Sequence, residues 1–329
     1  KGTKHIENLA KATVIAFDKT GTLTTGKMTI DEIKVFGEFD KENVLKYIYN
    51  LEMLSNHPIS TAIKQYEKNI QKLDVTDYKE IAGHGLYGII EQNEVLFGNK
   101  KLLDKYQINH NQANTQEDAI YLVVNKKIAG AITLQEEIRQ NCKDITKNLN
   151  KIGITKTIML TGDNEISAKK VQQQVNVTEI KTRLLPQEKL QEIKALKANN
   201  EKVIFIGDGI NDSPVLAASN FGIAMGEADA IASTTADSIL ISNNISSLPD
   251  IIKTAKRTML VVKFNIIFSL LVKAIVLILG AIGIAPIWLA ILADTGVTFL
   301  TVVNAVKNIK RHSKYNICNK LHNVLKYSI

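Results

Sequence analysis

The segment from Ala12 to Thr24 reads ATVIAFDKTGTLT. Its first part, Ala12–Phe17, is a short apolar run rich in β-branched side chains, which predicts a buried strand. The run ends at Asp18, after which Gly21 and the threonines interrupt regular structure. Open α/β sheets bind ligands at the carboxyl ends of their strands, where Asp18 stands. A carboxylate in that position can attack phosphorus and form an aspartyl-phosphate.

Further along the chain, strands and helices alternate. We predict strands at 157–160, 203–206 and 221–224, and helices at 165–174, 190–199 and 213–219. Such alternation indicates a parallel α/β sheet with helices on both faces. Residues 27–130 interrupt this sheet as an insertion, with predicted helices at 42–52 and 58–68 and hairpins at 87–97 and 121–132. We therefore expect a doubly wound parallel-sheet domain carrying an inserted α+β domain.

The C-terminal third is apolar. Between Phe264 and Lys307 the charged residues are Lys273 and Asp294. The two halves, 264–283 and 287–307, are each about 20 residues long, which is enough for one bilayer crossing. Basic residues flank both ends of this stretch, which places both ends in the cytoplasm. The pattern predicts a transmembrane helical hairpin; a fully buried soluble hairpin is the alternative.

Net charge and cysteine content exclude some classes of function. The formal net charge is +8, but the lysines are scattered and no nucleic-acid-binding motif occurs, so no nucleic-acid partner is expected. Cys142 and Cys318 form neither a C-x-x-C pair nor a disulfide framework. No secretory signal opens the chain. A reducing, cytosolic setting is expected for the polar part of the chain.

Three further motifs follow predicted strands of the parallel sheet. Thr161-Gly162-Asp163-Asn164 comes after the strand at 157–160, Lys189 lies in LLPQEK, and residues 207–214 read GDGINDSP. In this order, and together with DKTGTLT at 18–24, they resemble the P-type ATPases, whose signature matches at all seven positions. The resemblance covers nearly the whole chain and implies a haloacid-dehalogenase-like phosphorylation domain.

The resemblance also implies roles for individual residues. Asp18 would become phosphorylated, and Lys189 would neutralise phosphate charge. Thr161, Gly162 and Asp163 would bring donors to the phosphoryl group. Asp18, Thr20 and Asp208 would hold Mg²⁺, a cation that suits carboxylate and phosphate oxygens. The remaining members of the acidic pocket would be Asn211 and Asp212.

The inserted segment resembles the nucleotide-binding domain of the heavy-metal (type IB) branch. The similarity rests on His57-Pro58, on Gly83 and Gly85 around His84, and on Gly98-Asn99. It implies that these residues bind ATP, with the glycines allowing close backbone approach. Two departures from the family pattern are Asn56, where Glu is common, and residues 227–230. His84 is expected to be a loop side chain.

The apolar hairpin indicates which metal is moved. Lys273 and Asp294 lie near the middle of their helices, where a charge in the bilayer core costs free energy. Charged residues at such positions are therefore candidates for a functional role. The surrounding sequence resembles the zinc, cadmium and lead exporters, which implies a transport-site carboxylate at Asp294 and a partner at Lys273. Copper(I) exporters carry Tyr-Asn and methionine groups there, whereas no methionine occurs between Val261 and Lys307. The tail residues His312, Cys318 and His322 are poor evidence for a metal site.

The predicted organisation runs in six segments: 1–26, a linker and the first part of the phosphorylation domain; 27–130, the nucleotide-binding domain; 131–246, the rest of the phosphorylation domain; 247–263, an amphipathic connecting helix; 264–307, two transmembrane helices; and 308–329, a cytosolic tail.

The predicted function is ATP-driven export of Zn²⁺, Cd²⁺ or Pb²⁺ through an aspartyl-phosphate. The protein would be a multi-pass cell-membrane protein with cytoplasmic catalytic domains. The chain lacks an initial Met, a TGE loop and a Cys-Pro-Cys helix. We therefore expect a C-terminal portion that is not transport-competent alone and whose partners are the lipid bilayer, an actuator domain and N-terminal membrane helices. The alternatives are a copper(I) exporter, a soluble Asp-nucleophile phosphatase and a non-catalytic membrane subunit.

Overall fold

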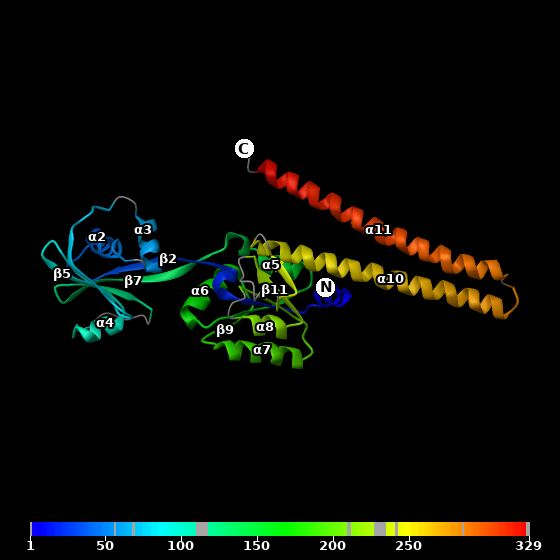
Figure 1. The fold of residues 1–329 in the computed structure, drawn as a ribbon, viewed down its shortest axis with the longest axis horizontal. Coiled ribbons are helices and arrows are strands. Elements are labelled where there is room, and N and C mark those ends of the chain that lie inside the picture. Colours follow the sequence, from blue (N-terminus) through cyan, green and yellow to red (C-terminus); the bar gives the residue numbers. More distant parts are fainter. Residues whose placement is uncertain are drawn as a thin grey trace.

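The computed structural model describes residues 2–55, 57–67, 70–109, 118–208, 212–226, 235–240, 243–284 and 286–326, without the side chains of Pro58, Ile287 and 308–326. Figure 1 shows three parts in a row. A domain built on a parallel sheet occupies the centre, a second sheet domain lies on one side, and a long helical hairpin extends from the other side.

The central domain contains a six-stranded sheet in the order β12-β11-β10-β1-β8-β9, within the described ranges. Every neighbouring pair in it is parallel. Its strands are β1 (Val14–Asp18), β8 (Lys156–Leu160), β9 (Glu179–Lys181), β10 (Val203–Gly207), β11 (Phe221–Met225) and β12 (Ser238–Leu240). All five residues of β1 are buried, as expected for a strand covered on both faces.

Helices cover both faces of this sheet. Ile15 and Phe17 pack into a cluster with side chains of α1 (Thr3–Ala10), α5 (Ile145–Lys151), α6 (Glu165–Val175) and the beginning of α10 (Leu248–Ala281). Val14 and Ala16 point the opposite way, toward α7 (Pro186–Ala198) and α8 (Ser213–Ala218). Successive strand residues alternate between faces, so β1 serves both cores. The predicted doubly wound parallel sheet is confirmed.

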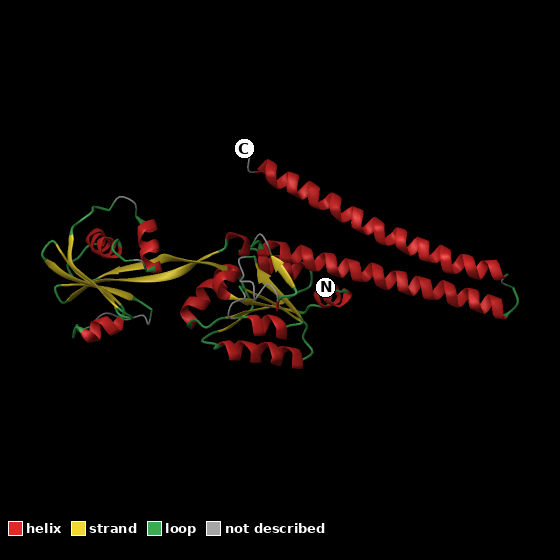
Figure 2. Ribbon diagram, viewed as in Figure 1, coloured by secondary structure: helices red, strands yellow, loops and turns green. Residues whose placement is uncertain are grey.

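The inserted domain is an antiparallel sheet in the order β2-β7-β6-β5-β4-β3. Its strands are β2 (Thr24–Val35), β3 (Val75–Ile81), β4 (Gly85–Ile90), β5 (Asn93–Gly98), β6 (Ile120–Val124) and β7 (Lys127–Ile138). Helices α2 (Lys41–Glu52) and α3 (Pro58–Tyr66) share one hydrophobic cluster, and α4 (Lys100–Lys105) belongs to another. The 12-residue strands β2 and β7 pair along their length and extend into the central domain (Figure 2).

The helices of the hairpin extend beyond the two apolar segments predicted from the sequence. The predicted connecting helix and first apolar segment form one continuous helix, α10, because no proline interrupts residues 250–281. Helix α11 (Ile287–Lys326) likewise continues through most of the predicted tail. The segments 245–281 and 288–307 are long and apolar enough to cross a membrane. Large apolar side chains such as Leu277 are exposed on them, which suits a lipid environment.

We predict that replacing isoleucine with alanine lowers the free energy of unfolding far more in the core than at the surface. Ile15 is fully buried in β1, so Ile15→Ala should lower the free energy of unfolding by about 3 kcal/mol. Ile166→Ala is the matched control, since Ile166 is 56% exposed, and should change it by less than about 0.5 kcal/mol. Chemical denaturation followed by circular dichroism measures both. Equal losses would contradict the packing described.

Candidate active site

Asp18 lies at the carboxyl end of β1 and meets a cation from α7. The side chain of Lys189, in the first turn of α7, places Nζ 2.5 Å from Asp18 Oδ1 and 3.1 Å from Asp212 Oδ1. Asp18 and Asp212 are 5% and 1% exposed. Two buried carboxylates therefore share one ammonium group, which offsets the cost of removing their charges from water.

A third carboxylate completes this group. Asp208 follows β10 directly, and Asp212 immediately precedes α8. One oxygen from each of Asp18, Asp208 and Asp212 lies within 4.8 Å of the others. An all-oxygen donor set of this kind fits Mg²⁺, which takes a few carboxylates together with substrate phosphate. The structure thus brings together four residues predicted for the site: Asp18, Lys189, Asp208 and Asp212. The fifth, Asn211, lies outside the described residues.

The electrostatics of Asp18 and Lys189 are set by burial and by each other. Burial raises the pKa of Asp18 to about 7, the Asp212 carboxylate adds to the rise, and Lys189 opposes it. Burial alone lowers the pKa of Lys189, but the carboxylates of Asp18 and Asp212 outweigh it, and this pKa lies above its usual value. Lys189 therefore stays protonated, and positive charge at the site favours the ionised, nucleophilic form of Asp18.

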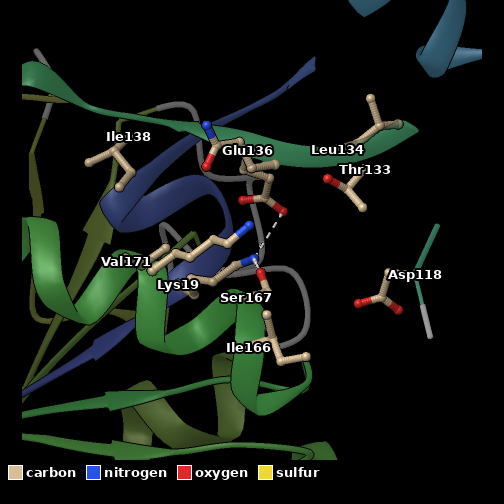
Figure 3. Close-up of a pocket in the computed structure, with 11 residues that line it drawn as sticks. Lys19, Asp118, Thr133, Leu134, Glu136, Ile138, Ile166, Ser167 and Val171 are labelled. Carbon is tan, nitrogen blue, oxygen red and sulfur yellow. Dashed lines mark hydrogen bonds and ion pairs between the residues drawn. The ribbon is translucent and has the colours of Figure 1, made fainter. Parts of the chain in front are cut away.

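The loop that follows Asp18, residues 19–24, is called here the Asp18 loop. Gly21 adopts a φ of +70°, and a Cβ there would lie 3.0 Å from the Cβ of Asp208. Only glycine combines that backbone conformation with so close an approach. Lys19 is buried and ion-paired with Asp163, and its Nζ lies 3.4 Å from Ser167 Oγ (Figure 3). Lys19 therefore links the Asp18 loop to the turn after β8 and to α6.

The residues predicted to face the phosphoryl group follow β8. Thr161 is 2% exposed, and its Oγ1 accepts a hydrogen bond from the Asp163 backbone N–H at 3.1 Å. The backbone N–H groups of Arg183 and Leu184, before α7, donate to the carbonyls of Asp163 and Thr161. These bonds bring the Thr161–Gly162–Asp163 turn beside the start of the Lys189 helix.

The inserted domain contains a pocket of about 400 Å³. The predicted nucleotide residues that line it are His57, Gly83, Gly85, Gly98 and Asn99. Pro58 is the first residue of α3, whose N-cap is His57. Asn99 Nδ2 donates to the Gly83 carbonyl at 2.9 Å, which ties the two glycine-containing segments together. The structure thus gathers these segments around one opening, although they are up to 42 residues apart in the sequence.

Two of these glycines are required by close packing. A Cβ on Gly85 would overlap the backbone of Phe97 and Gly98, and a Cβ on Gly98 would overlap the His84 carbonyl. Strands β4 and β5 pair Gly85 with Gly98, so the pocket floor is bare backbone at that point. His84 also lines the pocket, and its Nδ1 lies 2.8 Å from the Ala82 carbonyl oxygen.

Sequence reasoning missed two acidic residues in this pocket, Glu52 and Glu80. Glu52 ends α2 and is 3% exposed, and its Oε2 has no hydrogen-bond partner in the described part of the chain. Burial raises the pKa of Glu52 to about 7. Glu80 accepts a hydrogen bond from Tyr78 Oη at 2.8 Å. Neither residue belongs to a motif; Glu52 merely precedes His57 by five positions.

The hairpin places its two charged side chains in contact. Lys273 Nζ on α10 lies 2.6 Å from Asp294 Oδ1 on α11. A second polar contact lies about two helical turns away, where Asn304 Nδ2 donates to Asn265 Oδ1 at 2.8 Å and Asn265 Nδ2 donates to the Thr301 carbonyl. Interhelical hydrogen bonds of this kind hold apolar helices in register.

We predict that Glu52 makes stability depend on pH. Its pKa is about 7 in the folded state and near 4.5 otherwise, so the folded protein retains a proton that the unfolded chain releases between these values. Stability should therefore fall as pH rises through this window. At pH 8, Glu52→Gln should raise the free energy of unfolding by about 2 kcal/mol, and at pH 4.5 by almost nothing.

The measurement is chemical denaturation at both pH values, with Glu38→Gln, at an exposed position, as the control. An equal pH effect in the two variants would show that Glu52 is not the source.

Comparison with known proteins places this site in a family. The family described as haloacid dehalogenase-like hydrolase matches residues 12–220. The cadmium, zinc and cobalt-transporting ATPase of Bacillus subtilis (strain 168) is 39% identical over 319 residues, covering 95% of this chain and 45% of that protein. The zinc-transporting ATPase of a Synechocystis strain is 36% identical, covering 94% and 44%. The chain thus spans about half the length of these relatives.

Solved structures agree with this placement. A zinc-transporting PIB-type ATPase in an E2.Pi state superposes with a TM-score of 0.79 at 30% identity, covering 94% of this chain and 51% of the other. The catalytic domain of the CPx-ATPase CopB-B gives a TM-score of 0.62 at 32% identity, covering 77% of this chain and 94% of that domain. The chain therefore belongs to the haloacid dehalogenase-like hydrolases and, within them, to the P-type ATPases.

Proposed function

We propose that this chain is the catalytic and C-terminal membrane part of a pump that exports soft divalent metal ions, Zn²⁺, Cd²⁺ or Pb²⁺, at the expense of ATP. The observation that carries the proposal is the buried Asp18 carboxylate, held 2.5 Å from Lys189 and grouped with Asp208 and Asp212. Phosphoryl transfer depends mainly on positioning and charge neutralisation, and this arrangement supplies both.

In the proposed reaction an oxygen of Asp18 attacks the γ-phosphorus of ATP. An O–P bond forms, the bond to the bridging oxygen of ADP breaks, and ADP leaves with the electron pair. Lys189 and the donors of the Thr161–Gly162–Asp163 turn offset the charge on the phosphoryl oxygens. Asp18, Thr20 and Asp208 would hold Mg²⁺, which supplies further positive charge there when bound. In this scheme Asn211 and Asp212 complete the acidic side.

We propose that ATP binds in the pocket of the inserted domain. His57 can stack on or donate to adenine, while Gly83, Gly85, Gly98 and Asn99 let the nucleotide approach the backbone. The unpartnered Oε2 of Glu52 is an acceptor suited to the adenine amino group. The pocket and Asp18 belong to different domains joined through β2 and β7, so transfer requires the two domains to approach each other.

The proposed transport site contains Asp294, with Lys273 as the partner that promotes release. A carboxylate is a ligand for divalent ions, and the Lys273 ammonium 2.6 Å away competes with a bound cation for it. The names of similar proteins, which mention cadmium and zinc, support this choice. Copper(I) prefers thiolate or thioether ligands, and residues 261–307 contain no methionine or cysteine.

The proposed location is the cell membrane, as a multi-pass protein with its catalytic domains in the cytoplasm. The two long apolar helices and the basic residues around them support this. The proposed partners are the lipid bilayer, an actuator domain and the N-terminal membrane helices of the same pump, without which the chain would not transport. The alternative of a soluble phosphatase explains neither the pocket of the inserted domain nor the apolar hairpin.

Labelling with ATP tests the proposed reaction. Incubation with ATP labelled at the γ-phosphate should leave acid-stable, hydroxylamine-sensitive phosphate on the wild-type protein. Asp18→Asn should reduce that label at least about 100-fold, because the amide lacks the nucleophilic charge. Asp74→Asn, at an exposed position, is the control and should label normally. Absence of label in the wild type, even with the actuator domain and N-terminal helices supplied, would exclude the pump.

Metal stimulation tests the transport site. In the complete pump, Asp294→Ala should abolish stimulation of ATP hydrolysis by Zn²⁺, Cd²⁺ and Pb²⁺ while ATP affinity stays within about twofold, because the substitution lies in the membrane part. Thr295→Ala, next to it on α11, serves as the control. Stimulation that survives in Asp294→Ala would refute the assignment of this residue, and wild-type stimulation by Cu⁺ alone would refute the choice of metal.

A further inference from the structure

Glu136 lies near the end of β7, where this strand meets the Asp18 loop. Its Oε1 accepts a hydrogen bond from Thr20 Oγ1 at 3.0 Å, and its Oε2 accepts one from Thr24 Oγ1. Its Oε1 is also 3.7 Å from Lys19 Nζ. A single carboxylate therefore contacts both ends of the loop; Figure 3 shows its contact with Lys19.

Thr20 is exposed, whereas the contacts of Glu136 with Lys19 and Thr24 are largely shielded from water. The side chains of Glu136 and Lys19 are 10% and 4% exposed. Hydrogen bonds to an ionised carboxylate are stronger than those between neutral groups, and low exposure strengthens them further. Within the loop, Thr24 Oγ1 also lies 3.0 Å from the Lys19 carbonyl oxygen and accepts a hydrogen bond from the Gly21 backbone N–H. Glu136 thus holds the hydroxyl that organises the turn at Gly21, the residue packed against Asp208.

The strand that carries Glu136 also belongs to the inserted domain. Residues 130–136 of β7 pair with residues 28–35 of β2, and the pairing has a register shift just before Met28, the residue opposite Glu136. Lys170 of α6 is ion-paired with Asp31 of β2, beside the same junction. A change in the direction of this strand pair would move Glu136 relative to the central sheet, because the residue is part of the strand.

We propose that Glu136 is a positioning residue that ties the orientation of the inserted domain to the geometry of the Asp18 loop. This rests on the proposed phosphorylation of Asp18. With Glu136 in place, Thr20 and Gly21 are held beside Asp208, and Asp18 faces Lys189. When the strand pair turns, the Thr20 and Thr24 hydroxyls lose their shared acceptor, and the loop loosens.

The test compares Glu136→Ala with Glu137→Ala. Glu137 is the adjacent residue on β7 and contacts Thr25 at the surface, which makes it a matched control. Glu136→Ala should increase hydrogen exchange of the backbone amides of residues 19–24 at least about tenfold, since loss of a hydrogen-bonded charge costs a factor of this size. The Glu137→Ala variant should exchange like the wild type. Because Glu136→Ala removes most of the side chain and could disturb folding, Glu136→Gln serves as a second variant. Its hydrogen exchange at residues 19–24 should lie between that of the wild type and that of Glu136→Ala.

The second readout is labelling of the wild-type and variant proteins with ATP. Glu136→Ala should slow phosphorylation of Asp18 about tenfold or more while ATP affinity stays within about twofold, a split that general destabilisation would not produce. Unchanged exchange of residues 19–24 in both Glu136 variants would overturn the proposal. If the wild type is not labelled at all, the phosphorylation proposal fails separately, and the exchange data still decide whether Glu136 orders the loop.

Discussion

The charge pair between Lys189 and Asp18 is the interaction on which the rest of the site depends. A carboxylate with 5% exposure is unstable as an ion unless positive charge stands beside it, and Asp212 and Asp208 make that need greater. The parallel sheet places this positive charge beside Asp18. The carboxyl ends of β1 and β10 lie at one edge of the sheet, and α7, which carries Lys189, begins there. The apolar strands and the two packed faces serve to hold these few charged atoms at fixed distances.

Much of this arrangement follows from sequence because the chemistry sits directly after apolar strands. Asp18 is the last residue of β1, and Thr161 and Asp208 come immediately after β8 and β10; each strand is recognisable as a short apolar run. Once the sheet is inferred to be parallel, these ends must converge. The glycines of the pocket in the inserted domain were predicted from the family resemblance, and the structure places two of them, Gly85 and Gly98, opposite each other at the ends of β4 and β5.

Other parts depend on contacts that have no local signature. Glu136 reaches Thr20 across 116 residues, and the strand register, including its shift near Met28, decides which of two adjacent glutamates points inward. Glu52 is buried by the neighbouring sheet, although its own helix reads as an ordinary amphipathic segment. The predicted amphipathic connecting helix and the first apolar segment lie on one helix, α10, because a change from polar to apolar composition does not by itself end a helix whose proline, Pro249, lies in the first turn.

The unbroken course of α10 has a mechanical consequence. The helix is anchored in the central domain by Leu248 and Ile252 and carries Lys273 about 37 Å further on, at 1.5 Å per residue. Because α10 contains no proline after Pro249 in its first turn, it should bend only gently, and a rotation of about 5° at its anchored end would move the ammonium group by roughly 3 Å. A displacement of that size is comparable to the 2.6 Å that separates Lys273 Nζ from Asp294 Oδ1.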